Sequence, residues 1–152
     1  MTERRPLSVD LVLAPVDASD ESADAVAYAT AIASKYDATV HVVHVLGEEV
    51  VREIEDGVVD EAQIAADGEA IMEAAERIAA EHDVPLSTSV AYGFSTKMKL
   101  RHPGSVVLDT AEELDADFLV VPREPVSGAP GEVLAKAAEY VLLYASQPVL
   151  SV

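Results

Sequence analysis

Residues 9–46, VDLVLAPVDASDESADAVAYATAIASKYDATVHVVHVL, decide the fold because they predict a strand, a helix and a second strand. Residues 9–16 and 38–46 are short apolar runs rich in β-branched side chains, which is typical of strands buried on both faces. Between them, alanine and valine recur at helical spacing, and Ser19 or Asp20 can cap the start of that helix. Two buried strands joined by one helix predict a right-handed crossover in a parallel sheet.

The rest of the chain continues this alternation of strands and helices. We expect helices over about 60–82, 105–114 and 131–145, and strands over 86–92, 117–121 and 148–152. This order predicts a three-layer α/β/α arrangement with a five-stranded parallel sheet. In such a sheet, ligands bind beyond the carboxyl ends of the strands, where the strand order reverses. The composition shows no break, so a single domain over residues 1–152 is expected.

The charge of the chain limits its partners. The sequence has 28 acidic and 10 basic residues and a net charge of -18, which argues against binding to nucleic acid or to an anionic membrane. We interpret the charge as the shell of a folded protein in the high-salt cytoplasm of a halophile, where counterions screen it. No apolar run reaches membrane-spanning length, and Asp10 breaks the first run, so neither a spanning helix nor a signal peptide is expected.

One segment is basic, in contrast to the acidic remainder of the chain. Residues 84–108 contain no Asp or Glu, and within them the segment 94–102 carries Lys97, Lys99, Arg101 and His102. These cations could pair with acidic neighbours or with a second subunit. They could also form a contact for an anion.

The sequence offers few residues or motifs for catalysis or metal binding. The absence of Cys excludes disulfides, cysteine zinc sites and thiol catalysis. His41 and His44 are three apart on a strand, so they should point to opposite faces and cannot chelate one metal ion. No phosphate-binding loop, dinucleotide fingerprint or nucleophile elbow is present. We therefore predict no catalytic residue and no metal site.

The ordered set LVLAPVDASDESADAVAYA, TVHVVHV, AEELDADFLVV and AAEYVLLYASQPVLSV covers nearly the whole chain. With this set the chain resembles the universal stress protein family. The resemblance implies a flavodoxin-like or adenine nucleotide α-hydrolase-like sheet, a homodimer formed through the last strand, here 148–152, and a role in stress survival.

Part of this family binds ATP through a glycine-rich loop after the fourth strand, and the resemblance places the key positions of that loop here. They are Pro122, Pro125, Ala135 and Lys136. None of the four matches the glycines or the hydroxyl residue of that branch. The two prolines lack an N–H and have a fixed φ, which a phosphate cradle built from backbone donors does not tolerate. The sequence thus predicts a member of the branch without this loop.

The part of the family's nucleotide site that contacts the nucleoside is less altered in this sequence than the phosphate loop. The resemblance makes Asp17 the residue that contacts the nucleoside, and it makes the backbone around Val43 the lining of the base. Asp17 also has a purely structural interpretation, because an acidic residue before a helix caps its N–H groups.

Three functions remain open at this point, and one of them is an enzyme built on this nucleotide-hydrolase-like scaffold. The first is a non-enzymatic stress-response homodimer that acts through contacts with an unknown protein partner and holds no cofactor. The alternative is a module that binds ATP, AMP or another anion with Asp17 and the basic segment, where Lys97, Lys99, Arg101 and Lys136 replace the lost backbone donors. Any nucleotide hydrolysis by such a module is expected to be weak.

Overall fold

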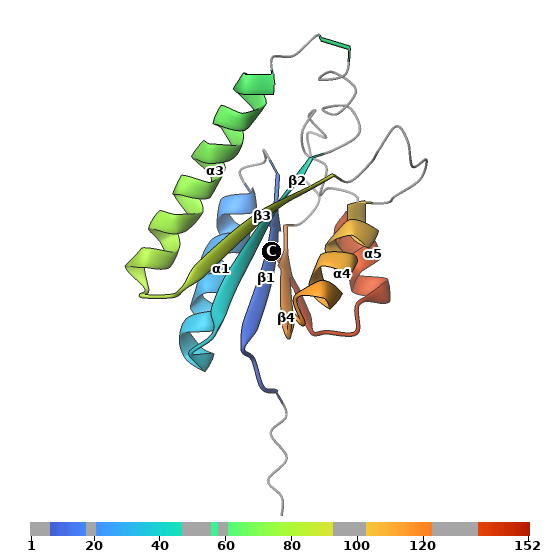
Figure 1. Cartoon of the computed structure of the whole chain (residues 1–152). Coiled ribbons are helices and arrows are strands. Elements are labelled where there is room, and N and C mark those ends of the chain that lie inside the picture. Colours follow the sequence, from blue (N-terminus) through green and yellow to red (C-terminus); the bar gives the residue numbers. More distant parts are fainter. Residues whose placement is uncertain (1–6, 18–20, 47–55, 58–60, 93–102, 123–136) are drawn as a thin grey trace, which may run out of the picture.

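The computed structural model describes residues 7–17, 21–46, 56–57, 61–92, 103–122 and 137–152. Strands and helices alternate along these residues (Figure 1). The elements are β1 (Leu11–Val16), α1 (Glu21–Tyr36), β2 (Thr39–Leu46), α3 (Glu61–Glu81), β3 (Leu86–Tyr92), α4 (Pro103–Glu113), β4 (Phe118–Val121), α5 (Ala137–Tyr144) and β5 (Val149–Ser151).

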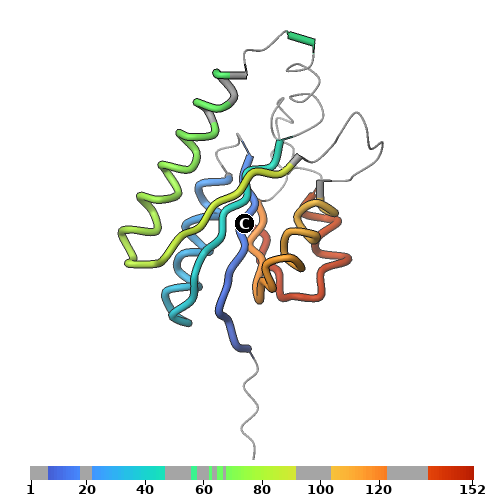
Figure 2. The backbone as a smooth tube through the Cα atoms, in the orientation of Figure 1, coloured from blue at the N-terminus to red at the C-terminus, as the bar shows by residue number. Residues whose placement is uncertain are grey.

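The five strands form one parallel sheet in the order β3-β2-β1-β4-β5. Helices α1 and α3 cover one face of the sheet, and α4 and α5 cover the other (Figures 1 and 2). The predicted α/β class with a five-stranded parallel sheet is confirmed. Within the described residues, no helix is long and apolar enough to cross a membrane.

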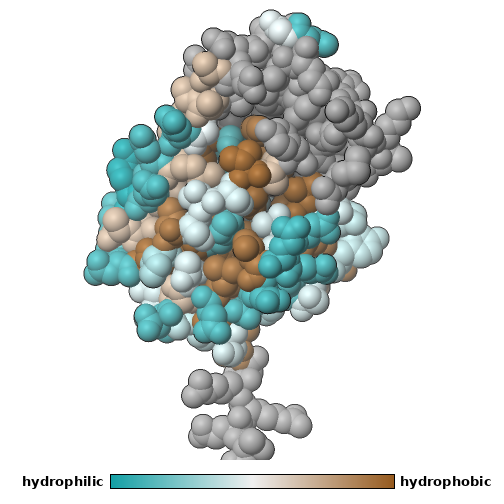
Figure 3. Space-filling model, viewed as in Figure 1, coloured by the Kyte–Doolittle hydropathy of each residue, from teal (hydrophilic) through white to brown (hydrophobic). Residues whose placement is uncertain are grey.

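The core consists of two apolar clusters, one on each face of the sheet. Alternation along β1 sends Val12 and Ala14 toward α1 and α3, and Leu13 toward α4 and α5. The side chains are mainly valine and alanine, which lets the helices approach the sheet closely. In Figure 3, hydrophilic residues cover the outer sides and apolar residues reach the surface between them.

Several element boundaries differ by one or two residues from the sequence prediction. Strand β4 begins at Phe118 instead of Asp117, although the Asp117 N–H already donates to the Leu11 carbonyl (2.9 Å). The Asp117 carboxylate contacts β1 as well. Its Oδ2 accepts hydrogen bonds from the N–H groups of Asp10 (2.8 Å) and Leu11 (3.1 Å), which fastens β4 to the start of β1. Helix α4 begins earlier than expected, at Pro103, since proline is well suited to the first helical position.

Three helices end with the same backbone turn. An aspartate with positive φ follows α1, α3 and α4, namely Asp37 (56°), Asp83 (53°) and Asp115 (53°). In each turn the next N–H donates back to a buried alanine carbonyl, as in a Schellman motif. These bonds join Ala38 to Ala33 (2.9 Å), Val84 to Ala79 (3.0 Å) and Ala116 to Ala111 (2.9 Å).

The strand order reverses at β1, which has β2 on one side and β4 on the other. The described ladder between β1 and β4 pairs Val12 with Phe118 and Leu13 with Leu119. Although β1 continues to Val16 and β4 to Val121, the ladder includes no further pair of these strands. The carboxyl ends of the strands at this reversal point are where such sheets bind ligands.

Candidate functional site

Asp17 follows directly after β1, at the carboxyl end of the sheet. Its side chain is buried, with 2% of the residue exposed. The Asp17 N–H donates to Ser22 Oγ (2.9 Å), and the Ser22 hydroxyl donates to Asp17 Oδ1 (3.0 Å). Because Ser22 lies in the first turn of α1, these two bonds tie the carboxylate to the start of that helix. A buried carboxylate at the strand-order reversal is the first component of a candidate site.

His44 of β2 is a second buried polar group toward the same end of the sheet. Burial lowers its pKa, and the negative charge of Asp17 partly offsets this lowering. Gly68 of α3 packs directly against the imidazole, since a Cβ atom at this position would lie 3.2 Å from His44 Nδ1. Gly68 was not among the predicted site residues, although an isolated glycine inside a helix often marks a close contact.

A cavity of about 300 Å³ lies beside Asp17, between α1 and α3. It is lined by Val16, Asp17, Ser22, Ala23, Val26, Ala70, Ile71, Ala74, Ala75 and Ile78. Eight of these ten residues are apolar, and the two polar ones are the hydrogen-bonded pair Asp17 and Ser22. The cavity could not be predicted from the sequence, because its walls come from two helices and no local pattern specifies how closely these helices pack.

Pro122 stands at the tip of β4, on the other side of the reversal point, and is buried. It offers no N–H at the place where a phosphate-binding turn would begin. The other predicted loop positions, Pro125, Ala135 and Lys136, lie outside the described residues. The cations of the basic segment, Lys97, Lys99 and Arg101, lie outside them as well. Of the predicted binding side chains, the structure thus describes Asp17, and it places Asp17 in the candidate site.

Val43 occupies a different place from Asp17. Its side chain is fully buried in the cluster between the sheet and the α4/α5 layer. Its backbone lies in the ladders with Pro15 of β1 and Ser89 of β3. Val43 does not line the cavity, and its backbone contact with a base stays a prediction.

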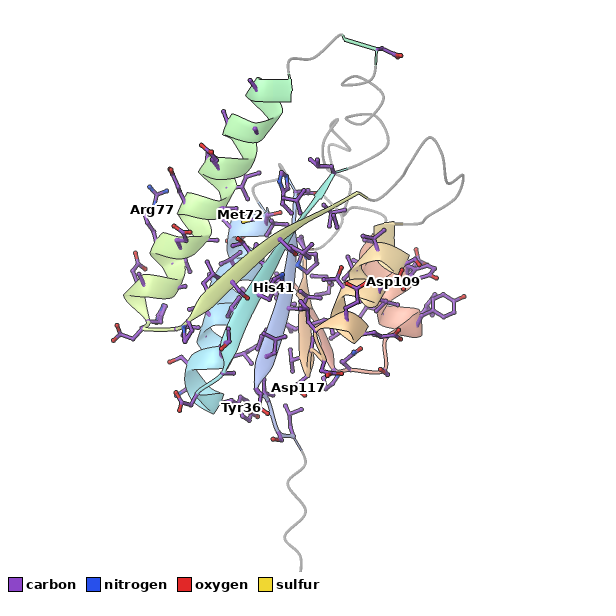
Figure 4. All side chains as sticks on the ribbon, in the orientation of Figure 1. Tyr36, His41, Met72, Arg77, Asp109 and Asp117 are labelled. Atoms are coloured by element: carbon purple, nitrogen blue, oxygen red, sulfur yellow. The ribbon has the colours of Figure 1, made fainter. Side chains whose placement is uncertain are left out.

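His41 lies on the opposite face of β2 from His44, as the spacing of the two residues predicts. Its Nδ1 lies 2.7 Å from Ser87 Oγ, and its Nε2 lies 2.8 Å from Ser89 Oγ, so two hydroxyls of β3 satisfy the ring. Burial lowers its pKa. Figure 4 shows His41 within the sheet. In the described part of the chain, no cluster of acidic or histidine side chains could hold a metal ion.

Solved structures with the same fold cover nearly the whole chain. The universal stress protein UspA from Lactobacillus plantarum is 20% identical, with a TM-score of 0.71 over 95% of this chain and 98% of that one. A universal stress protein from Archaeoglobus fulgidus, solved in complex with dAMP, is 22% identical, with a TM-score of 0.63 over 95% and 98%. A further universal stress protein, solved in complex with cAMP, is 22% identical, with a TM-score of 0.65 over 95% and 97%.

Comparison of the sequence with protein families gives a match of similar extent. No curated protein matches the chain significantly. The model of the universal stress protein family matches residues 9–152, which include all five strands of the sheet and every residue of the candidate site. The chain belongs to the universal stress protein family.

Proposed function

We propose that this member of the family is a non-enzymatic stress-response protein that acts as a homodimer through the edge of β5 and through contacts with a protein partner. The observation that carries the proposal is the apolar surface at the end of α5. Leu142, Leu143 and Tyr144 are 53%, 69% and 65% exposed. An exposed apolar group of this kind is typical of a surface that another protein covers.

Strand β5 adds a second component to this surface. It forms one edge of the sheet, and its residues are only half-buried. Val149 packs on the α4/α5 side, while Leu150 and Val152 pack on the α1/α3 side. A second copy that pairs with this edge would satisfy its open backbone groups and cover apolar side chains on both faces.

Pro122 supports the proposal that the protein lacks the usual ATP-binding loop. A buried proline directly after β4 removes a backbone donor at the reversal point of the sheet. With a net charge of -18, we further expect the protein to work in a cytoplasm of high salt concentration.

Light scattering in molar KCl tests the dimer. We expect a mass of about twice the 16.1 kDa of one chain, and a monomer for Leu143→Glu or Leu150→Glu. Val90→Glu is the matched control, because Val90 is also exposed but belongs to β3, at the opposite edge of the sheet. A monomeric wild type, or a dimer that only Val90→Glu disrupts, would contradict the proposal.

A second candidate function is the binding of ATP, AMP or another anion. The buried Asp17 at the reversal point supports contact with the nucleoside of such a ligand, and two structurally similar proteins were solved in complex with dAMP and cAMP. The basic segment with Lys97, Lys99 and Arg101 would supply the charge for the phosphates.

Mass spectrometry of small molecules released by denaturation separates the two functions. Protein purified in high KCl should release no stoichiometric nucleotide if the first function holds. If it releases one, Asp17→Asn should lower the recovered amount, and so should the pair Lys97→Ala and Lys99→Ala. Calorimetric titration with ATP and AMP then measures the affinity directly.

A further inference from the structure

The cavity between α1 and α3 exists because small side chains face one another across it. Ala23 of α1 and Ala70, Ala74 and Ala75 of α3 line it, and alanine is too short to fill the space between two helices. Ala23 and Ala70 are exposed, so this side of the cavity meets solvent. Larger apolar side chains, Val26, Ile71 and Ile78, complete the walls. A molecule inside would thus touch apolar surface from both helices.

The polar end of the cavity presents an acceptor. Ser22 has one hydroxyl proton, and it donates this proton to Asp17 Oδ1. Asp17 is the one charged residue in the described lining, and it is negative. A carboxylate accepts hydrogen bonds and attracts positive charge, and it repels anions. The chemistry of this end therefore matches a positively charged donor.

Neighbouring charges favour the same kind of ligand. The described cations on the two helices, Lys35 and Arg77, are exposed and do not line the cavity. On α3, Arg77 points away from the sheet while Met72 points toward it (Figure 4).

The volume of the cavity limits its ligand to a small molecule. About 300 Å³ is at the lower end of ordinary ligand pockets, and apolar cavities of about 150 Å³ already admit benzene. We propose that the cavity binds a small organic amine with one apolar ring, whose ammonium group contacts Asp17 and whose ring lies between α1 and α3. This site is independent of the β5 edge, and it differs from a nucleotide site in the sign of the ligand charge.

Nuclear magnetic resonance in molar KCl tests this site with 2-phenylethylamine as the probe. We expect saturable shifts of the methyl signals of Val26, Ile71 and Ile78. 3-Phenylpropionate has the same ring with a carboxylate in place of the amine, and it should cause no saturable shift. The dimer state, measured by light scattering on the same samples, should not change on binding.

Two variants locate the amine. Asp17→Asn keeps the shape of the side chain but removes its charge, and we expect the affinity to fall about tenfold or more. Ala74→Leu should abolish binding by filling the cavity, whereas Ala80→Leu, at an exposed position of the same helix, should leave binding unchanged. Circular dichroism of each variant shows whether the fold is retained.

Three results would overturn the proposal. They are the absence of saturable shifts at millimolar probe, equal binding of the amine and the carboxylate, and an unchanged affinity in folded Asp17→Asn. Loss of the dimer with retained amine binding would leave this site standing while contradicting the proposed function.

Discussion

The two faces of the sheet are built differently. The face covered by α1 and α3 has a cavity and buried polar groups at the end of β1, in α1 and on β2, with Asp17, Thr30 and His44 among them. The face covered by α4 and α5 is a cluster of valine, leucine and alanine, and its buried histidine, His41, has a hydroxyl on each ring nitrogen. Both faces thus carry an apolar core, and the α1/α3 face has in addition a cavity and a buried carboxylate.

Strand β2 contributes to both environments because its side chains alternate. His41 and His44 belong to the same strand and are both buried. Two neutral hydroxyl groups surround His41. His44 instead packs on Gly68, and burial lowers its pKa while the charge of Asp17 partly offsets this lowering. Matched substitutions on the two faces can therefore separate packing from polar effects.

The largest difference in the free energy of unfolding is expected between alanine substitutions of two glycines, one in a helix on each face. A Cβ atom at Gly104 of α4 would lie 2.6 Å from the Cβ of Tyr140 in α5, a clash that forces the helices apart. We expect Gly104→Ala to lower the free energy of unfolding by about 2–3 kcal/mol, measured by denaturant titration in high KCl.

Gly68→Ala is the matched substitution on the other face. Its new methyl would meet the end of the His44 ring at 3.2 Å, and alanine gains about 1 kcal/mol of helix propensity over glycine. We expect a net change of less than about 1 kcal/mol. If Gly68→Ala cost as much as Gly104→Ala, the α1/α3 face would be as tightly packed as the α4/α5 face.

The two histidines should make stability depend on pH. Burial lowers both folded pKa values below the ordinary 6.5, so the unfolded chain binds protons more readily. The free energy of unfolding should therefore fall as pH drops below about 6.5, by up to about 1.4 kcal/mol per pH unit for each histidine. His41→Asn and His44→Asn should each reduce this slope in unfolding curves measured at several pH values.

Asp17→Asn distinguishes the two rings. It removes the charge that partly offsets the effect of burial on His44, so the pKa of His44 should fall further. The pKa of His41, whose lowering is due to burial alone, should stay constant. Proton chemical shifts of the imidazole rings report both values in one titration, and equal movement of the two would argue against a direct effect of Asp17.

The last comparison concerns the stability of two threonine variants, one on each face. Thr30 Oγ1 of α1 is buried and has no hydrogen-bond partner in the described structure, whereas Thr110 Oγ1 of α4 donates to the Val106 carbonyl (2.9 Å). Thr30→Val should raise the free energy of unfolding by about 1 kcal/mol, and Thr110→Val should lower it by up to about 1 kcal/mol. Thermal unfolding measures both, and destabilisation by Thr30→Val would indicate that a water molecule satisfies Thr30.

The helices and strands could be predicted from the sequence, because buried strands and amphipathic helices each have a recognisable local pattern of apolar residues. Residues 86–92 coincide with β3, and the opposite orientation of His41 and His44 follows from strand geometry alone. The use of Asp117 could not be predicted, since its partners are remote in sequence. The cavity also escaped prediction, because it depends on how closely α1 and α3 pack.

The candidate site was predicted only in part. Asp17 could be identified because it follows the first predicted strand and because the resemblance to the family places the nucleoside contact there. The contact between Gly68 and His44 required the register of α3 against β2, which no local pattern specifies. Binding through Lys97, Lys99, Arg101 and Lys136 stays a prediction.

The turns at Asp37, Asp83 and Asp115 have a consequence for the ion atmosphere of the protein. Each aspartate adds a negative charge at a helix C-terminus, which already carries about half a negative charge. The three turns lie at the amino end of the sheet (Figure 1), near Asp10 and Asp117. These turns therefore form a local group of negative charges at one end of the sheet, and we expect potassium ions to gather there in concentrated KCl.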